Sequence, residues 1–443
     1  MTIYALSSGS GISGISVIRV SGPETKNVIE KLSEGRFPKP RVATLKKINK
    51  LNSKELIDEG IIIWFPGPNS YTGEDMAEFH LHGSRAVIMA IQASIEQIKG
   101  CRIAEPGEFT KLALQNNKIN LLRAEGIGDL IKSETEIQRK QAIKIMSGAN
   151  ISKFDVWREK LVKILSNIEA KIDFPEEDLP LEILKNLKID AKKIEEEIKK
   201  TLNDNKVGEI IREGFKIAIV GPSNAGKSSL LNYLSRREVA IVSEMAGTTR
   251  DVIETHLNID GYPVIVSDTA GIRDSKDEIE KKGIKLALKK SDDADLNIVL
   301  IEPKSGYFAG FLKDLISDKS IFVINKSDLG IDNIVNEFKK YNPIYISLKR
   351  EKNIEQLISA VKSKLKYKFK TSEEIIITRE RHRQHLEKCI NHLENFIKKK
   401  DIDDFDKAAE DLRLATRHLG MIVGKVDVEE ILGSIFHDYC IGK

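Results

Sequence analysis

Residues 221–229 have the types and the spacing needed to bind a nucleotide phosphate. They read Gly-Pro-Ser-Asn-Ala-Gly-Lys-Ser-Ser and directly follow the largely apolar segment 216–220. Glycines at this spacing let backbone N–H groups curl around phosphate oxygens, and Lys227 adds a positive charge. The hydroxyl of Ser228 can bind a magnesium ion. The pattern is that of a phosphate loop between a strand and a helix, as its chemistry requires.

Two further motifs follow in the order expected of a guanine-nucleotide site. Asp268-Thr-Ala-Gly271 comes after the apolar segment 264–266, and Asp268 can hold the magnesium ion from its other side. Asn325-Lys-Ser-Asp328 comes after the apolar segment 321–324. The carboxylate of Asp328 can accept hydrogen bonds from the N1–H and the amine of guanine, a pair that adenine lacks. Together the three motifs predict a GTP-binding protein.

Two more segments complete the predicted nucleotide site. Ser347-Leu-Lys349 follows the last predicted strand, where a Ser-Ala-Lys loop usually contacts guanine through backbone N–H groups. Gly247-Thr-Thr-Arg-Asp251 is a candidate switch, since a threonine hydroxyl there can bind magnesium and move away after hydrolysis. The predicted nucleotide-binding residues are Gly221, Asn224, Ala225, Gly226, Lys227, Ser228, Ser229, Ser243, Thr248, Thr249, Asp268, Thr269, Ala270, Gly271, Asn325, Lys326, Asp328 and Ser347.

The residue that positions the attacking water is not the usual one. Ile272 stands where Ras-like proteins carry a glutamine, and an aliphatic side chain cannot orient water. We therefore expect a nearby carboxylate to take this role; the candidates are Asp274, Asp277, Glu278 and Glu280. Arg250 and Arg273 are candidates for supplying positive charge within the same chain.

Asn224 in the phosphate loop allows two interpretations. Its side-chain carbonyl could coordinate a monovalent cation beside the β- and γ-phosphates, delivering the charge that an arginine finger would supply. It could instead be a turn-forming residue, a common use of asparagine. The residue type leaves both interpretations open.

The composition fits a multidomain globular protein. A chain of 443 residues exceeds the ~250–300 at which a single core stops growing, so two or three domains are expected. A net charge of +4 neither requires nor excludes a nucleic-acid partner. The cysteines Cys101, Cys389 and Cys440 are too scattered for a disulfide framework or a zinc site, which favours a reducing cytoplasm. We expect neither a signal peptide nor a membrane span.

The chain divides into segments of different periodicity. Residues 1–118 combine turns with predicted strands at 15–20, 61–65 and 77–81, and predict an α+β domain. In the segment 77–81, Glu78 and His80 should lie opposite Phe79 and Leu81. Residues 119–213 and 371–443 carry helical apolar stripes, with an expected break at 174–180 and a last stripe over 428–435. Residues 214–370 alternate strands and helices and predict a doubly wound, parallel α/β P-loop GTPase domain. Because each helical flank alone leaves its stripe uncovered, we expect one discontinuous all-α domain around an inserted GTPase domain.

The whole chain resembles the MnmE (TrmE) family of tRNA modification GTPases. The phosphate-loop, switch and Asp268-Thr-Ala-Gly271 motifs are shared with related GTPases such as Era and Der. Tyr71-Thr-Gly-Glu-Asp75, Pro106-Gly-Glu-Phe109 and the terminal Cys440-Ile-Gly-Lys443 are more specific, since they resemble the family's folate-type domain and its tail. The resemblance covers the N-terminal, GTPase and helical segments in the family's order.

The resemblance implies cofactors and partners. It implies an N-terminal domain that dimerises and binds 5-formyl- or methylene-tetrahydrofolate, with Arg19, Glu78, Lys118 and Lys443 at the matching positions. It also implies a flavoprotein partner of the MnmG (GidA) type, carrying FAD and NADH, in a heterotetramer. Together they would install an aminomethyl or carboxymethylaminomethyl group on carbon 5 of the wobble uridine, position 34, of certain tRNAs.

For the GTPase chemistry, the resemblance implies GTPase domains that meet across a potassium ion in the dimer. The matching potassium ligands are Asn224, Ser243, Met245 through its backbone, and Thr248. Magnesium falls to Ser228 and Thr249. Glu280 matches the family's catalytic glutamate, so the predicted catalytic residues are Glu280, Asn224 and Arg250.

Several alternatives stay open at this point. A regulatory GTPase of ribosome assembly, like Era or Der, would share the GTPase motifs, but Era would carry a KH-like RNA module in place of the helical C-terminal segment. A GTP-gated scaffold without chemistry is a third possibility. Glu78 could be a solvent-facing strand residue, and Cys440 and Lys443 a frayed tail. Residues 362–370, rich in lysine, either contact tRNA, with Tyr367 and Phe369 stacking on bases, or form a solvated helix end.

Overall fold

The chain forms two compact units in the computed structural model. Unit 1 comprises residues 1–128, 145–165 and 413–443, and unit 2 comprises 129–144 and 166–412. The structure describes residues 1–9, 11–53, 55–148, 151–173, 181–222, 224–237, 239–240, 254–268, 288–303, 315–330, 336–369, 375–399, 405–425 and 442. Among these residues, no helix combines the length and apolar character needed to cross a bilayer. The domain boundaries at 118, 213 and 370 stay predictions.

Unit 1 begins with a six-stranded sheet in the order β3-β4-β5-β2-β1-β6. Neighbouring strands are antiparallel except β1 and β6, which are parallel. The predicted strands 15–20, 61–65 and 77–81 are confirmed within β2, β4 and β5. The strands are β1 Thr2–Leu6, β2 Ser13–Ser21, β3 Thr44–Asn49, β4 Leu56–Phe65, β5 Met76–Gly83 and β6 Cys101–Ile103, and the first helices are α1 Thr25–Leu32 and α2 Arg85–Glu96.

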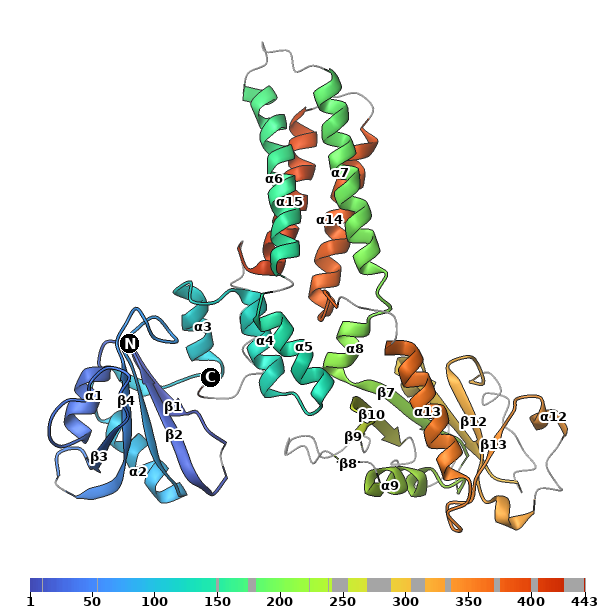
Figure 1. Cartoon of the computed structure of the whole chain (residues 1–443), viewed down its shortest axis with the longest axis horizontal. Helices are drawn as coiled ribbons and strands as arrows, with labels where there is room; N and C mark the ends of the chain where they lie inside the picture. Colours follow the sequence, from blue (N-terminus) through green and yellow to red (C-terminus); the bar gives the residue numbers. More distant parts are fainter. Residues whose placement is uncertain are drawn as a thin grey trace, which may run out of the picture. The chain divides into compact units, whose positions relative to one another are not determined.

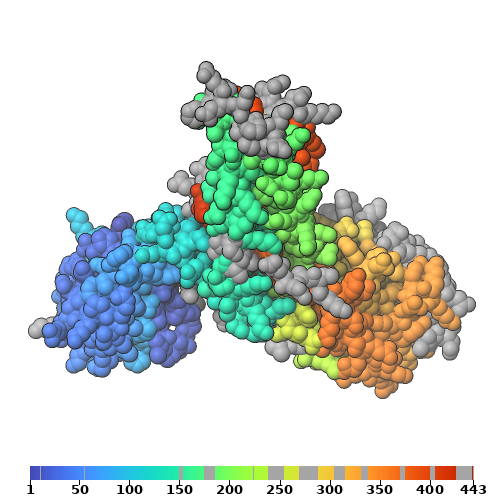
Figure 2. Space-filling view, turned by 45° about the horizontal axis from the view of Figure 1, so that its top comes forward, coloured from blue at the N-terminus to red at the C-terminus, as the bar shows by residue number. Residues whose placement is uncertain are grey.

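The core of this domain lies between the sheet and these two helices. Phe79 and Leu81 of β5 are buried against Ile29 of α1 and Ile91 of α2 in one apolar cluster. The side chains of Glu78 and His80, which alternate with these two, lie on the other face, as predicted. The space-filling view shows the blue N-terminal residues gathered in one body (Figure 2).

The helical segments carry the predicted apolar stripes. In α6, Phe154, Trp157, Leu161 and Ile164 are buried at helical spacing, which confirms that stripe. Residues 174–180 and 428–435, where a break and a last stripe were expected, lie outside the described residues. The helices are α3 Glu108–Gln115, α4 Leu121–Ile131, α5 Glu136–Met146, α6 Ile151–Asp173, α7 Leu181–Leu202, α8 Val207–Glu213, α14 Glu380–Lys398 and α15 Phe405–Val423.

Helices from the two sides of the GTPase segment lie against each other within each unit. In unit 2, α7 runs beside α14, and Lys199 Nζ pairs with Glu394 Oε1 at 2.7 Å (Figure 1). In unit 1, Lys425, just after α15, pairs with Asp155 of α6 at 2.8 Å. The two flanks therefore cover each other, as their uncovered stripes predict.

Unit 2 contains a seven-stranded sheet in the order β13-β12-β11-β7-β10-β9-β8. The five strands from β13 to β10 are parallel, as expected, but β9 and β8 are antiparallel at the edge. The reason is a tight hairpin: Asp260 and Gly261 between β9 and β10 both have positive φ, 56° and 88°. The elements are β7 Phe215–Val220, α9 Lys227–Arg237, β8 Val239–Ala240, β9 Glu254–Ile259, β10 Tyr262–Asp268, β11 Leu296–Ile301, β12 Ser320–Ile324, η1 Ser327–Leu329, α12 Asn336–Lys339, β13 Ile344–Tyr345 and α13 Ile354–Phe369.

This sheet is apolar on both faces. Ile217 and Ile219 of β7 pack in one cluster with Leu230 of α9 and Leu357 of α13. Val220 lies in a second cluster on the opposite face, with residues of β11 and β12. Burial of both faces is typical of parallel α/β sheets, whose ligands bind at the carboxyl ends of the strands.

Candidate functional site

The phosphate loop leaves the carboxyl end of β7 through glycines that no other residue could replace without movement. A Cβ atom on Gly221 would lie 2.0 Å from the carbonyl oxygen of Leu300. Gly226 has φ 101°, and a Cβ there would lie 2.4 Å from Nδ2 of Asn325. Asn224 also adopts the left-handed conformation, with φ 64°, which fits its turn-forming interpretation. The loop is therefore pressed against the next strands.

Lys227, the first residue of α9, is buried at the base of this loop. Its side-chain Nζ donates hydrogen bonds to the carbonyl oxygens of Gly221 and Pro222, both at 2.9 Å. Burial lowers the pKa of Lys227, and the nearby carboxylate of Asp268 opposes that shift. The two hydrogen bonds hold the cationic group within the turn of the loop that phosphate oxygens would approach.

Ser228 and Asp268 supply adjacent oxygen atoms next to the loop. The hydroxyl of Ser228 donates to Oδ2 of Asp268 at 2.5 Å, and Asp268 is only 3% exposed. The pair forms because β7 and β10 are parallel neighbours, so the loop after one strand meets the last residue of the other. A hydroxyl and a carboxylate are hard oxygen ligands of the kind that magnesium prefers, so the residues present fit that ion.

Asn325 ties the phosphate loop to the loop after β13. Its Nδ2 donates to the carbonyl oxygen of Ala225 at 2.9 Å, and its Oδ1 accepts from the backbone N–H of Leu348 at 3.2 Å. The hydroxyl of Ser347 donates to Oδ1 of Asp328 at 2.5 Å. That hydrogen bond lowers the pKa of Asp328, so its carboxylate is an ionised acceptor at neutral pH. The base-recognition motif and the loop after β13 therefore form one structure.

Glu302 is a residue of this site that the sequence did not reveal. It follows β11 and forms an ion pair with Nζ of Lys326, within the base-recognition motif. The available signal was its position, because it is the first residue after a buried parallel strand.

A second polar site lies on the N-terminal sheet around Arg19. Arg19 of β2 pairs with Glu78 of β5 across the register, with Nη2 and Oε1 2.9 Å apart. The Arg19 guanidinium carbon lies 5.6 Å from the centre of the Tyr71 ring and 5.7 Å from that of Phe109. His80 Nε2 lies 3.3 Å from the other Glu78 oxygen. With a side chain only 17% exposed, Glu78 is not a simple solvent-facing residue.

The two N-terminal sequence segments that carry the family resemblance meet at this site. The hydroxyls of Tyr71 and Thr110 are 2.9 Å apart. Nδ2 of Asn116 donates to the carbonyl oxygen of Thr72 at 2.7 Å. The Lys118 side chain packs beside Gly73, where an added Cβ would lie 3.0 Å from its Cε. Lys118 is therefore next to the 71–75 loop that lines the Arg19 site.

The C-terminal tail reaches the same domain at Gly442. The hydroxyl of Ser7 donates to the carbonyl oxygen of Gly442 at 2.8 Å. Gly442 is buried with φ 96°, and a Cβ there would lie 2.2 Å from the Leu6 carbonyl oxygen. Leu6 belongs to β1, in which the preceding Ala5 pairs with Arg19. At Gly442 the tail is thus docked rather than frayed.

The lysine-rich end of α13 is partly committed to internal contacts. Lys362 and Lys366 pair with Asp260 at 3.8 and 3.3 Å. Phe369 stacks on Tyr262 with ring centres 4.7 Å apart, so the expectation that it could stack on a base is wrong. Tyr367 is 81% exposed.

Many predicted residues lie outside the described part of the chain, so their roles stay predictions. They are Ser243, Met245, Thr248, Thr249, Arg250, Thr269, Ala270, Gly271, Ile272, Arg273, Asp274, Asp277, Glu278, Glu280, Cys440 and Lys443.

Two family models match the chain. The model described as the MnmE helical domain matches residues 121–440, and that of the N-terminus of the GTP-binding protein TrmE matches residues 2–118. The chain belongs to the MnmE family of tRNA modification GTPases. As a member of the MnmE family it is a GTP hydrolase. Because the segments on both sides of the GTPase domain match MnmE family models, the chain is not an Era- or Der-like protein.

Relatives named tRNA modification GTPase MnmE match over their full length. The protein of Pelagibacter ubique (strain HTCC1062) is 69% identical over 443 residues, covering 100% of both chains. That of Rickettsia bellii (strain RML369-C) is 44% identical over 447 residues, again covering 100% of both. A solved structure, the G domain of the T. maritima FeoB iron transporter, is 23% identical and covers 34% of this chain and 98% of its own, with a TM-score of only 0.26.

Proposed function

We propose that this chain is a potassium-dependent GTPase that, with an MnmG-type flavoprotein, modifies carbon 5 of the wobble uridine in certain tRNAs. The group installed would be aminomethyl or carboxymethylaminomethyl. The observation that carries the proposal is an assembled nucleotide site within a chain of the MnmE family: Ser228 meets Asp268, and Ser347 meets Asp328. A cytoplasmic location follows from a tRNA substrate.

In this proposal each part of the nucleotide site has its own task. Backbone N–H groups of the phosphate loop and the ammonium of Lys227 bind phosphate oxygens, and Asp328 selects guanine. Ser228 and Asp268, joined by Thr249, would hold magnesium, which offsets negative charge on the phosphates when bound. Asn224, Ser243, Met245 and Thr248 would hold potassium, and Glu280 would orient the attacking water, with Arg250 as a further source of charge.

We also propose that the Arg19 site binds a tetrahydrofolate, with Lys118 and Lys443. Arg19 is a cation placed beside the Tyr71 and Phe109 rings, and Glu78 is a hydrogen-bond acceptor next to it. A flat heterocycle with N–H donors and an anionic tail offers complementary chemistry to this set. Gly442, the residue directly before Lys443, is docked at Leu6 of the same domain.

A homodimer would cover the open face of the N-terminal sheet. On the face that carries Glu78, Leu45 of β3 is 65% exposed and Ile61 of β4 is 38% exposed, and the two are register partners. Exposed apolar neighbours on a sheet are typical of an interface, and we propose a second copy as the occupant. Sedimentation of the full chain with Leu45→Glu should show monomers; unchanged dimers would contradict this surface.

The test of the function is nucleoside analysis of tRNA from cells that lack this chain. We expect carbon 5 of uridine 34 to lose its substituent, and the native sequence supplied on a plasmid to restore it. Normal wobble uridines together with a defect in ribosomal subunits would overturn the proposal in favour of a role in ribosome assembly.

A further inference from the structure

The short helix α8 connects the helical part of unit 2 to the first strand of the GTPase sheet. It has only seven residues, and α5 side chains donate to its carbonyl oxygens: Gln141 to Gly208 at 2.9 Å and Gln138 to Arg212 at 3.3 Å. At Gly208 a Cβ atom would lie 2.0 Å from the carbonyl oxygen of Ile377. The segment that enters the GTPase sheet is therefore in direct backbone contact with the segment that leaves it.

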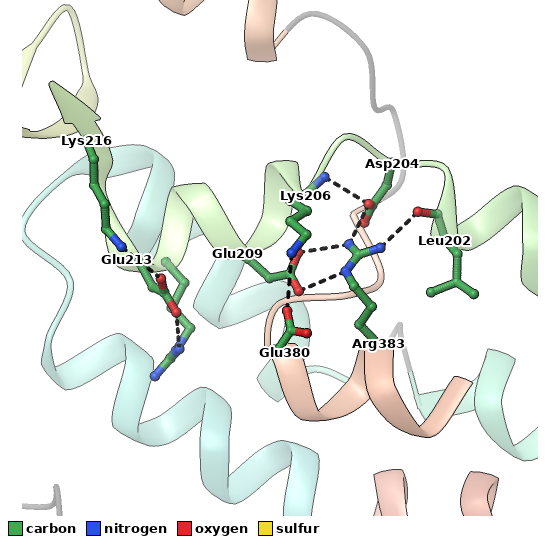
Figure 3. Close-up of polar contacts among 9 residues, drawn as sticks. Leu202, Asp204, Lys206, Glu209, Glu213, Lys216, Glu380 and Arg383 are labelled. Atoms are coloured by element: carbon green, nitrogen blue, oxygen red, sulfur yellow. Dashed lines mark hydrogen bonds and ion pairs between the residues drawn. The ribbon is translucent and has the colours of Figure 1, made fainter. Parts of the chain in front are cut away.

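Arg383 of α14 forms hydrogen bonds that join the segment entering the GTPase sheet to the segment leaving it. Its Nε and Nη2 donate to the two carboxylate oxygens of Glu209 in α8, at 3.1 and 2.8 Å (Figure 3). Nη2 also donates to Asp204 at 2.7 Å, and Nη1 to the carbonyl oxygen of Leu202 at 2.9 Å. The Arg383 and Glu209 side chains are both 8% exposed. One guanidinium thus joins the end of α7, the loop after it, α8 and α14.

A second carboxylate fixes the same two connections to α4. Asp129 accepts from Nε of Arg212 at 3.1 Å and from Nη2 of Arg379 at 2.6 Å. Arg212 lies near the end of α8, and Arg379 directly precedes α14. The entry and the exit of the GTPase segment are therefore held at two charged points by the helical part of the unit.

The C-terminal end of α8 packs against β10, the strand that ends at the nucleotide site. Gly214 directly follows α8, and a Cβ there would lie 2.9 Å from Cγ1 of Ile265 in β10. The last residue of β10 is Asp268, which accepts from Ser228. A shift of β10 with the state of the nucleotide would therefore reach α8 through direct packing.

We propose that Arg383 is a positioning residue that couples GTP hydrolysis to tRNA modification. By fixing α8 to α14 and to the loop after α7, it makes the helical domain move with the GTPase sheet. Without the hydrogen bonds of Arg383, the GTPase sheet could rotate relative to the helices that precede and follow it. A buried ion pair contributes little net stability, but its directional hydrogen bonds select one arrangement of the parts that it joins. The inference rests on the proposed role in wobble uridine modification.

The test uses full-length chains with Arg383→Lys and, separately, Glu209→Gln. Lysine keeps the charge but lacks the planar fork that serves Glu209, Asp204 and Leu202 together. Each variant is supplied to cells that lack the chain, tRNA nucleosides are measured, and the GTPase rate of the purified protein is recorded. We expect a loss of modification of about 5- to 150-fold, the usual range of coupling between sites. The GTPase rate should stay that of the native chain, whereas the melting temperature should fall, because removing one partner of a buried ion pair is destabilising.

Lys206→Ala is the matched control. Lys206 pairs with Glu380 at 3.4 Å and joins the loop before α8 to α14, but the two side chains are 58% and 54% exposed. Exposed pairs contribute little, so the control should modify tRNA normally.

Three outcomes would overturn the inference: normal modification by both variants, a proportional loss of GTPase activity, or an equal defect in the control. A native chain that hydrolyses GTP without modifying tRNA would refute the proposed function instead.

Discussion

The hydroxyl of Ser228 donates a 2.5 Å hydrogen bond to the carboxylate of Asp268, 40 residues further along the chain. One oxygen comes from the start of α9 and the other from the end of β10, two elements that meet only in the folded sheet. The motif spacing predicted that both would face one magnesium ion. The geometry supports that prediction, because the two oxygens already share a site.

Ser228→Ala should raise the magnesium concentration needed for half-maximal GTP hydrolysis. Even groups that only support a metal ligand typically change metal affinity by about 10–100-fold, so loss of a direct ligand should cost at least as much. Ser235→Ala on the same helix is the control, since the Ser235 hydroxyl donates only to the carbonyl oxygen of Leu231. A magnesium titration that is identical in all three proteins would remove Ser228 from the metal site.

Asp328→Asn should weaken GTP binding and relax discrimination against xanthine nucleotides. Asparagine loses the charged acceptor for the guanine amine, a loss that typically costs ~1.5–3 kcal/mol, or roughly 10- to 150-fold in affinity. Calorimetry with GTP and with XTP measures both effects. Asp318→Asn, an exposed carboxylate in the same domain, should change neither. Unchanged GTP affinity in Asp328→Asn would mean that this motif does not read the base.

Asn224→Gly should abolish the acceleration of GTP hydrolysis by potassium while leaving nucleotide binding intact. Glycine is preferable to alanine here because Asn224 has φ 64°, which glycine adopts without strain. Removing one electrostatic stabiliser of a transition state typically costs about 10²–10³ in kcat. Rates are compared in potassium and in sodium. If the native chain hydrolyses GTP equally fast in both salts, the cation role of Asn224 is lost.

Gly442→Ala should weaken folate binding and spare GTP hydrolysis. The added Cβ would lie 2.2 Å from the Leu6 carbonyl oxygen and must displace the tail that carries Lys443. Losing a hydrogen bond to a charged group typically costs ~1.5–3 kcal/mol, or roughly 10- to 150-fold in affinity. Gly9→Ala is the control, because nothing lies within 4 Å of its Cβ position. Calorimetry with 5-formyltetrahydrofolate decides: native affinity in Gly442→Ala would separate the tail from the Arg19 site.

The features that the sequence predicted are those in which local chemistry fixes local structure. The phosphate loop follows from its glycines and Lys227, and the β5 alternation places Phe79 inward and Glu78 on the other face. The antiparallel edge of the GTPase sheet was not predicted, although Asp260-Gly261 is a tight-turn signal between two strands.

The features that the sequence did not predict are pairings between distant residues. Arg383 and Glu209 are 174 residues apart, and the sequence around either residue does not indicate that they pair. The stacking of Phe369 on Tyr262 and the pairing of Lys326 with Glu302 also depend on which elements become neighbours. Such contacts follow from the sheet order, which periodicity alone does not give.

The central claim is that this GTPase site drives wobble uridine modification, and Asp268→Asn tests it most directly. The decisive measurement is the nucleoside content of tRNA from cells whose only copy of the chain carries Asp268→Asn, beside cells carrying Asp318→Asn. We predict uridine 34 without its carbon-5 substituent in the first and normal modification in the second. Full modification in Asp268→Asn cells, with no GTP hydrolysis by the purified variant, would contradict the account.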